Sequence, residues 1–180
     1  QIKVLPGILR QAFFHKLVNP VEMTRAISGY AVRARRDGGL ALEQESKQAK
    51  SEFLRLGLQL VVDGTPAEMS REILGTEVEA MQSRHRAGEA IFSTLGGFAP
   101  TLGILGTVMG LVHMLANLED PGTMGPAIAA AFIATLYGVG TANLIFLPIA
   151  NKLKLRSQEE TISYQLAIEG ILAIQSGENP

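Results

Sequence analysis

Thr107 and Thr135 carry the most informative chemistry in this chain, because each hydroxyl lies inside a long uncharged stretch. A threonine of this kind most often bonds back to a carbonyl of its own helix. The alternative is that the hydroxyls face a cavity and line a path for an ion. Neither stretch contains Asp, Glu, Lys or Arg, so a conducted proton would need an acid from a partner.

The sequence offers no arrangement for covalent catalysis. It has no cysteine, no Gly-rich phosphate loop, no His-Glu metal spacing and no nucleophile beside a plausible base. Its three histidines, His15, His85 and His113, are far apart, and His113 fits an interface better than a proton carrier. The net charge of −1 argues against binding of nucleic acid. We expect no enzyme, no metal site and no cofactor, leaving a transported ion as the candidate ligand.

Two apolar runs predict a membrane hairpin. Residues 90–118 and 121–151 contain 29 and 31 residues without a charge, and a bilayer core needs about 20 helical residues. Only the segment "EDPG" separates them. We therefore expect spans at 89–118 and 124–151, joined by an extracytoplasmic turn at 119–123.

Basic residues predict the orientation. The turn carries only Glu119 and Asp120, whereas five cations flank the hairpin: Arg84, Arg86, Lys152, Lys154 and Arg156. Positive flanks stay in the cytoplasm. Residues 1–88 are then a cytoplasmic helical domain, and 152–180 a cytoplasmic C-terminal helix and tail.

Helix start and stop signals divide the cytoplasmic part. "NPVE" (19–22) and "TPAE" (65–68) are helix starts, with the first helix ending near Arg36. A second helix is expected over 40–62. The third begins at Pro66 and either continues into the first span or hinges at Gly96-Gly97. An amphipathic helix over 155–177 should pack on the domain through Ile162, Leu166, Ile168 and Leu172. The fold class is an all-α membrane protein.

Small residues line one face of each span. The first has Gly96, Pro100, Gly103, Gly106, Thr107 and Gly110, and the second has Ala131, Thr135, Gly138 and Ala142. Such spacing lets membrane helices pack closely, which needs no activity to explain it. Pro100 and Pro148 each remove a helical hydrogen bond inside an apolar run, which suggests bends that can change.

Four segments resemble the MotA-type stator subunits of the bacterial flagellar motor, within the wider MotA/ExbB/TolQ group. They are "GGFAPTLGILGTVMGLVHMLANLEDPG", "GPAIAAAFIATLYGVGTANLIFLPIANKLK", "RARRDGGLALE" and "EGILAIQSGENP". The resemblance implies the part after the second of four spans, in the bacterial inner membrane. It also implies a ring of five subunits around two MotB-type, peptidoglycan-binding partner chains, whose aspartate carries the ion while the ring turns the rotor.

The resemblance assigns roles to hairpin residues. Gly103, Thr107 and Gly110 would face the partner helices, and Pro100 and Pro148 would couple ion occupancy to cytoplasmic movement. Sodium-driven relatives resemble "TTLYG" where this chain has "ATLYG", with Ala134 before Thr135. The lost hydroxyl favours protons, although Thr107 keeps the hydroxyl of the sodium type.

The resemblance also places a rotor contact on the cytoplasmic loop. Arg35 and Glu43 match the family's charged pair that touches the rotor protein FliG, with Arg36 and Glu45 as additions. A solvated charged face is the alternative. Weak, screened ion pairs suit a contact that must release at every step.

An ExbB/TolQ-like energiser of an outer-membrane process is the competing function. The loop "RRDGGLALE" and the tail "EGILAIQSGENP" favour the motor. A membrane-bound enzyme or binding module has no supporting motif.

Overall fold

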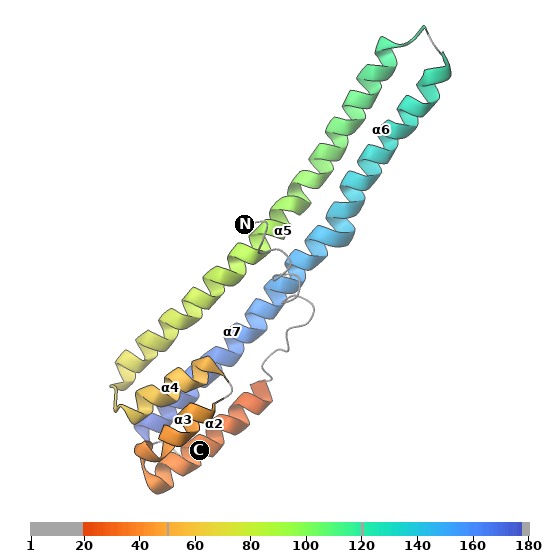
Figure 1. The fold of residues 1–180 in the computed structure, drawn as a ribbon. Helices are drawn as coiled ribbons and strands as arrows, with labels where there is room; N and C mark the ends of the chain where they lie inside the picture. The colour runs from red at the N-terminus through yellow and green to blue at the C-terminus, as the bar shows by residue number, and fades with distance from the viewer. Residues whose placement is uncertain (1–19, 50, 120, 178–180) are drawn as a thin grey trace. The chain divides into compact units, whose positions relative to one another are not determined.

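The computed structural model describes residues 20–49, 51–119 and 121–177 (Figure 1). These residues form helices and no strand, as expected for an all-α protein. The elements are α2 (Pro20–Asp37), the 3-10 turn η2 (Gly39–Leu42), α3 (Glu43–Gln48), α4 (Glu52–Val62), α5 (Ala67–Ala116), α6 (Pro121–Thr141), the π-helical turn η3 (Ala142–Phe146) and α7 (Leu147–Ser176).

The chain divides into two compact units. The hairpin comprises the described residues of 86–154, and the helical domain comprises those of 20–85 and 155–177. The expected edges of the spans, at residues 89 and 151, lie inside the continuous helices α5 and α7. The predicted cap residue Asn19, His15, the turn residue Asp120 and the last three residues of the tail lie outside the described residues.

Glycine and proline end and start the helices of the domain. Gly38, directly after α2, has a φ of 85°, and Gly64, shortly after α4, has a φ of 66°. Positive φ suits glycine because it has no Cβ. The Ser70 amide donates to the Pro66 carbonyl at 2.9 Å and closes the first turn of α5. The predicted ends of α2 and start of α5 are therefore confirmed.

The single helix predicted over 40–62 is wrong. The backbone is helical in three pieces, with Ala49 extended at φ −60° and ψ 127°. Leu42 is buried before the break, and Leu54 and Leu58 are buried after it, although an unbroken helix would place them about 120° and 160° away from Leu42. The break therefore lets both pieces bury their apolar side chains. The Ser46 hydroxyl donates to the Glu43 carbonyl at 2.8 Å just before the break. Burial thus outweighs the high helix propensity of this segment.

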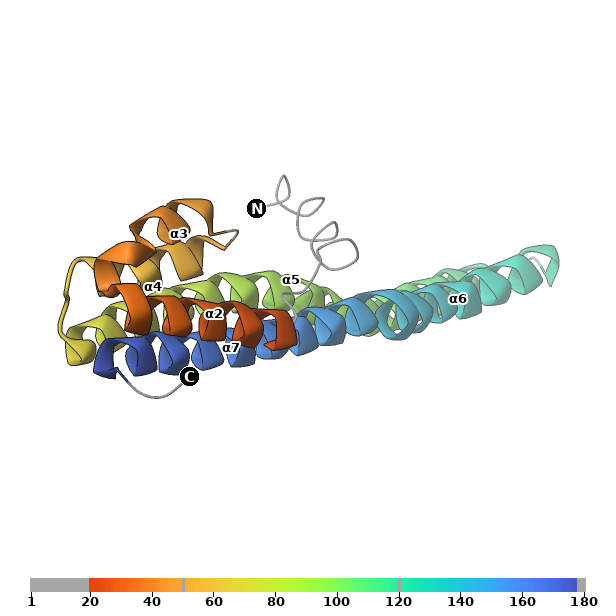
Figure 2. The same cartoon turned by 90° about the horizontal axis from the view of Figure 1, so that it is seen from below.

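The core of the helical domain lies between α2, α4, α5 and α7 (Figure 2). Its fully buried side chains include Leu42, Leu58, Leu74 and Ile171. Phe53 of α4 stacks on Tyr164 of α7 with ring centroids 4.3 Å apart. This core positions the charged loop between α2 and α4.

The predicted packing stripe of the C-terminal helix is half wrong. Ile168 and Leu172 are buried, but Ile162 and Leu166 are 54% and 45% exposed. Six residues separate Ile162 from Ile168, which places them about 120° apart around a helix. One face cannot hold both, and the buried face of α7 includes Ala167 and Ile171 instead.

The hairpin helices are long and apolar. Helices Ala67–Ala116 and Pro121–Ser176 are each long and apolar enough to cross a membrane. Only 11% of each apolar window is buried, which is not the pattern of a soluble core helix. Helix α5 passes through Gly96 and Gly97 without a break, so the continuous-helix alternative holds.

Candidate functional site: a threonine contact in the hairpin

Glycines bring α5 and α6 of the hairpin into close contact. A Cβ on Gly103 would lie 3.0 Å from the Ala134 carbonyl oxygen and 3.1 Å from the Gly138 Cα. A Cβ on Gly110 would lie 3.0 Å from the Cβ of Ala131. These separations leave little room for any side chain. The close packing expected from the small residues is confirmed.

This contact brings Thr107 and Thr135 together. The Thr107 hydroxyl lies within hydrogen-bond distance of the Thr135 hydroxyl, 3.0 Å from the Ala131 carbonyl oxygen and 3.1 Å from the Gly103 carbonyl oxygen. Both threonines are half-buried. The hydroxyl pair is thus a polar point between uncharged stretches of α5 and α6, held by the glycine contacts on either side.

Ala134 lies beside this pair. Its Cβ would be 2.9 Å from a Cβ on Gly106, so its methyl group packs against α5. The structure therefore brings together Gly103, Thr107, Gly110, Ala134 and Thr135 at the α5–α6 contact. The contact of Gly103 and Gly110 is with α6 of the same chain, and their part in an ion pathway stays a prediction.

The two predicted coupling prolines have different surroundings. Pro100 lies within α5, which stays α-helical around it. Pro148 follows the π-helical turn η3, in which the Leu147 amide donates to the carbonyl of Ala142, five residues earlier. Proline cannot donate to the carbonyl four residues before it, and π-turns occur where a helix must accommodate such a defect. Pro100 and Pro148 as moving joints remain predictions.

A second group of predicted residues lies in the last turn of α2 and the first turn of α3. Arg33 pairs with Glu45 of α3, Arg36 pairs with Asp37 at 2.8 Å, and Lys47 pairs with Glu43 at 2.7 Å. Arg35 precedes Arg36 in the last turn of α2. We name residues 33–47 the charged corner.

Arg33 is a residue that the sequence reasoning missed. It lies twelve residues before Glu45, a separation that no helical spacing rule connects. Hydrogen bonds from Arg36 lower the pKa of the Asp37 carboxyl, and a hydrogen bond from Lys47 lowers the pKa of Glu43. Both the carboxylates and the basic side chains of the charged corner therefore stay charged at neutral pH.

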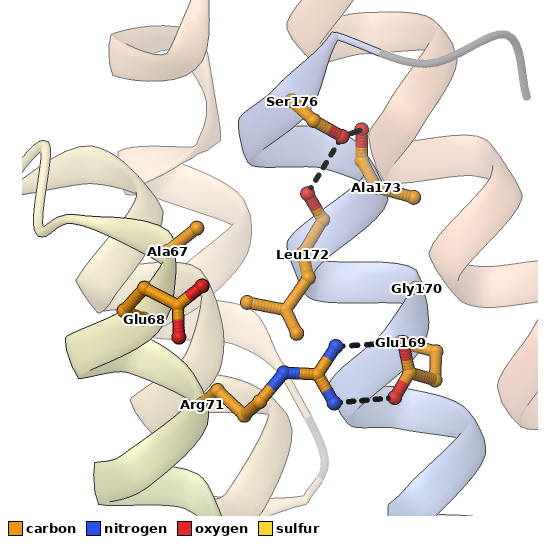
Figure 3. A pocket seen from close by; sticks show the side chains of 8 residues that line it. All are labelled: Ala67, Glu68, Arg71, Glu169, Gly170, Leu172, Ala173 and Ser176. Atoms are coloured by element: carbon orange, nitrogen blue, oxygen red, sulfur yellow. Dashed lines mark hydrogen bonds and ion pairs between the residues drawn. The ribbon is translucent and has the colours of Figure 1, made fainter.

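A groove of about 490 Å³ lies between α5 and α7 in the helical domain (Figure 3). Arg71 donates two hydrogen bonds to Glu169 across it, at 2.8 and 3.1 Å. The pair lowers the pKa of the Glu169 carboxyl. The pair joins the two helices across this groove. Among the described residues, no group of three or more His, Asp or Glu could hold a metal ion.

Comparison with known proteins agrees with this arrangement. Residues 45–166 match the model of the MotA/TolQ/ExbB proton channel family. The chain is 40% identical over its whole length to "Uncharacterized protein YtxD" of Bacillus subtilis, covering 66% of that protein. It is 42% identical to "Motility protein A" of the same organism, covering 100% of this chain and 67% of the relative.

A solved structure is also similar. The structure of the flagellar MotAB stator complex from Bacillus subtilis is 43% identical, with a TM-score of 0.91 over 99% of this chain and 71% of that chain. The chain spans about two thirds of the length of the curated relatives it matches. The matched region includes the threonine contact and its flanking glycines. The chain belongs to the MotA/TolQ/ExbB proton channel family.

Proposed function

We propose that this chain is the ion-conducting part of a stator subunit of the bacterial flagellar motor. The observation that carries the proposal is the contact of the Thr107 and Thr135 hydroxyls inside an uncharged hairpin. Its support is the similarity, over essentially the whole of this chain, to a protein named Motility protein A and to a flagellar MotAB stator complex. By that similarity, several copies assemble with a MotB-type partner, for which five around two is the expected ring.

The chemistry of the hairpin explains why a partner is needed. The described parts of both apolar runs contain no Asp, Glu, Lys or Arg, and their titratable side chains are those of His113 and Tyr137. A partner helix that carries a carboxylate would hold the ion in transit. The hydroxyls of Thr107 and Thr135 would supply hydrogen-bonding groups along its path.

We propose protons as the transported ion. Sodium needs several oxygen ligands, whereas a proton needs one acceptor at a time. At position 134 a methyl group packs on Gly106 where a second hydroxyl would add a ligand. The absence of that ligand beside Thr135 weakens a sodium site and leaves a proton path intact.

The proposed orientation places both flanks of the hairpin in the cytoplasm, with the protein in the bacterial inner membrane. The charged corner then faces the rotor, where Arg35, Arg36, Glu43 and Glu45 would meet FliG. Their exposed ion pairs can exchange partners at small cost, since exposed pairs contribute only about 0.2–1 kcal/mol. A contact made this way can form and release repeatedly.

Swimming speed tests the proposal. Cells whose only stator carries the full-length subunit are tracked with sodium removed, and then with a protonophore added. Speed that survives the first change and collapses after the second is the expected result. The opposite pattern would show a sodium motor and overturn the argument from Ala134. Cells that never swim, with normal filaments and expression, would contradict the motor function and favour the energiser.

A further inference from the structure

Leu40 is an apolar side chain that projects from the middle of the charged corner. It lies in the 3-10 turn η2 and is 75% exposed, more than any other large apolar side chain in the described part of the helical domain. A single exposed leucine is common on protein surfaces, so its surroundings must decide whether it has a role.

The backbone around Leu40 is held in one conformation. Gly38 enters the turn at a φ of 85°, and the Ala41 amide donates to the Gly38 carbonyl at 3.1 Å. The Glu43 amide donates to the Leu40 carbonyl, and the side chain of Leu42 is fully buried. The turn is therefore fixed from both sides, and it presents Leu40 to solvent in a preorganised position.

Leu40 shares its face with an exposed ion pair. Side chains three residues apart eclipse in a 3-10 helix, and those four apart are neighbours on an α-helix, which places Leu40, Glu43 and Lys47 in one line. Glu43 and Lys47 pair at 2.7 Å, and their side chains are 51% and 69% exposed. Leu40 therefore borders Glu43, one of the residues proposed to meet the rotor.

The charges of the corner cannot by themselves fix a partner in place. Glu43 with Lys47, and Arg36 with Asp37, already form pairs within the chain. Exposed pairs of this kind are screened by salt and contribute little to affinity, although they steer a charged partner and select it. In protein interfaces, the side chains that fix position are buried at the centre of a charged or polar rim. Leu40 has the position of such a centre.

We propose that Leu40 is the apolar anchor of the charged corner and inserts into a shallow apolar pocket of the rotor protein FliG. This proposal rests on the proposed motor function and adds to its ion pairs a side chain that fixes where the rotor is held. The pocket should be bordered by charges of both signs, because the corner presents both. One leucine buries little surface, so the contact can release at each step, while the fixed turn transmits force without bending.

Two substitutions at the same position test the anchor. Full-length subunits carrying Leu40→Ser or Leu40→Met are expressed as the only stator subunit, and torque is measured on beads tethered to the filament. Serine removes the apolar surface and should weaken the rotor contact about tenfold. We expect a loss of torque with proton flux in vesicles unchanged. Methionine keeps the apolar volume and should retain the torque.

Val21→Ser is the matched control. Val21 is also an exposed apolar side chain of the same domain, at 63%, but it lies at the other end of α2. Sixteen residues of helix separate it from Asp37, or about 24 Å. Torque in this variant should equal that of the unsubstituted protein.

Photo-cross-linking in cells tests the contact directly. The photoreactive amino acid p-benzoylphenylalanine replaces Leu40 in one strain and Val21 in another. Irradiation should join the subunit to FliG from position 40 and not from position 21. Equal cross-linking from both positions, or none from position 40, would overturn the anchor.

The outcomes separate this proposal from the proposed function. Full torque in the Leu40→Ser variant would overturn the anchor and leave the motor function standing. If that variant loses flux as well as torque, the cross-link from position 40 decides, and its absence overturns the anchor. Cells that never swim with the unsubstituted subunit would contradict the motor function, whereas a cross-link to FliG from position 40 in those cells would still support the contact.

Discussion

Gly103 of α5 and Gly138 of α6 face each other so closely that a Cβ on Gly138 would lie 2.8 Å from the Gly103 Cα. The same Cβ would lie 2.7 Å from the Ala99 carbonyl oxygen. Backbone atoms cannot yield as a flexible side chain can. The distance between the two helices is therefore set by these two glycines.

Replacing Gly138 with alanine should separate the helices of the hairpin. Overpacking of this kind costs about 1–3 kcal/mol, and the shift would also pull the Thr107 and Thr135 hydroxyls apart. We expect a lower thermal unfolding temperature of the purified complex in detergent, and slower swimming. Gly140→Ala is the matched control, because a Cβ there meets nothing within 4 Å. Equal effects of the two substitutions would contradict this account.

Replacing Thr107 with valine should impair ion flow. Valine keeps the shape but removes the hydroxyl that reaches Thr135 and the Ala131 carbonyl. The loss to stability should be small, about 0.6–2 kcal/mol for a hydrogen bond in a membrane. Proton flux measured in vesicles should fall much more than unfolding temperature does.

Thr141→Val is the control for this experiment, since the Thr141 hydroxyl donates within its own helix, to the Tyr137 carbonyl at 2.7 Å. Flux in the Thr141 variant should stay near that of the unsubstituted protein. Full flux in the Thr107 variant would show that its hydroxyl is structural only.

Removing Arg33 or Glu45 should loosen the charged corner. Their side chains are 49% and 26% exposed, so we expect a coupling energy of about 0.2–1 kcal/mol in a double-mutant cycle of the alanine variants. Chemical unfolding at low and high salt measures it, and high salt should reduce the coupling. Strictly additive effects of the two substitutions would mean that the pair contributes nothing.

Acid should weaken the link between α5 and α7 through Glu169. Its pKa is lowered in the folded protein, mainly by hydrogen bonds from Arg71, from an ordinary value of 4.5. A carboxyl whose pKa is lower in the folded than in the unfolded protein stabilises the fold at pH values above its unfolded pKa. This stabilisation is lost as the pH falls through its folded pKa. This contribution is therefore complete above about pH 4.5 and disappears at lower pH.

Helical circular dichroism across pH 3 to 7 measures this loss. Glu169→Gln removes the titrating group, so its unfolding should depend less on pH below about 4.5 than that of the unsubstituted chain. Glu159→Gln, an exposed carboxyl on the same helix, is the comparison. An unchanged acid profile in the Glu169 variant would contradict the assignment.

The hairpin could be predicted from sequence because its signals are local. Missing charges mark the spans, and the spacing of Gly103, Gly106 and Gly110 marks the packed face. The pairing of Gly103 with Gly138 could not be predicted, because the level of one helix against another depends on all their contacts together. The sequence therefore predicts which face of each hairpin helix is packed, but not which residues of the two faces lie opposite each other.

The helical domain was predicted less well, for two physical reasons. The break at Ala49 occurs at the strongest helix former, where burial of distant side chains decides the backbone. Ile162 and Leu166 are exposed in this chain, although the apolar spacing predicts that they are buried. An interface between chains leaves the same apolar pattern in the sequence as a core does, and the sequence alone cannot separate the two.

The π-helical turn η3 has a consequence for the faces of the helix that contains it. Ala131, Ala142 and Ala150 are all buried in the hairpin. Ala131 and Ala142 are eleven residues apart and nearly in phase, but an unbroken α-helix would place Ala150 about 100° away from Ala131. The extra residue of the π-turn acts as a one-residue insertion and brings Ala150 back into phase. A deletion within 142–146 should therefore preserve the phase, whereas a deletion elsewhere in the same helix would turn every later side chain by about 100°.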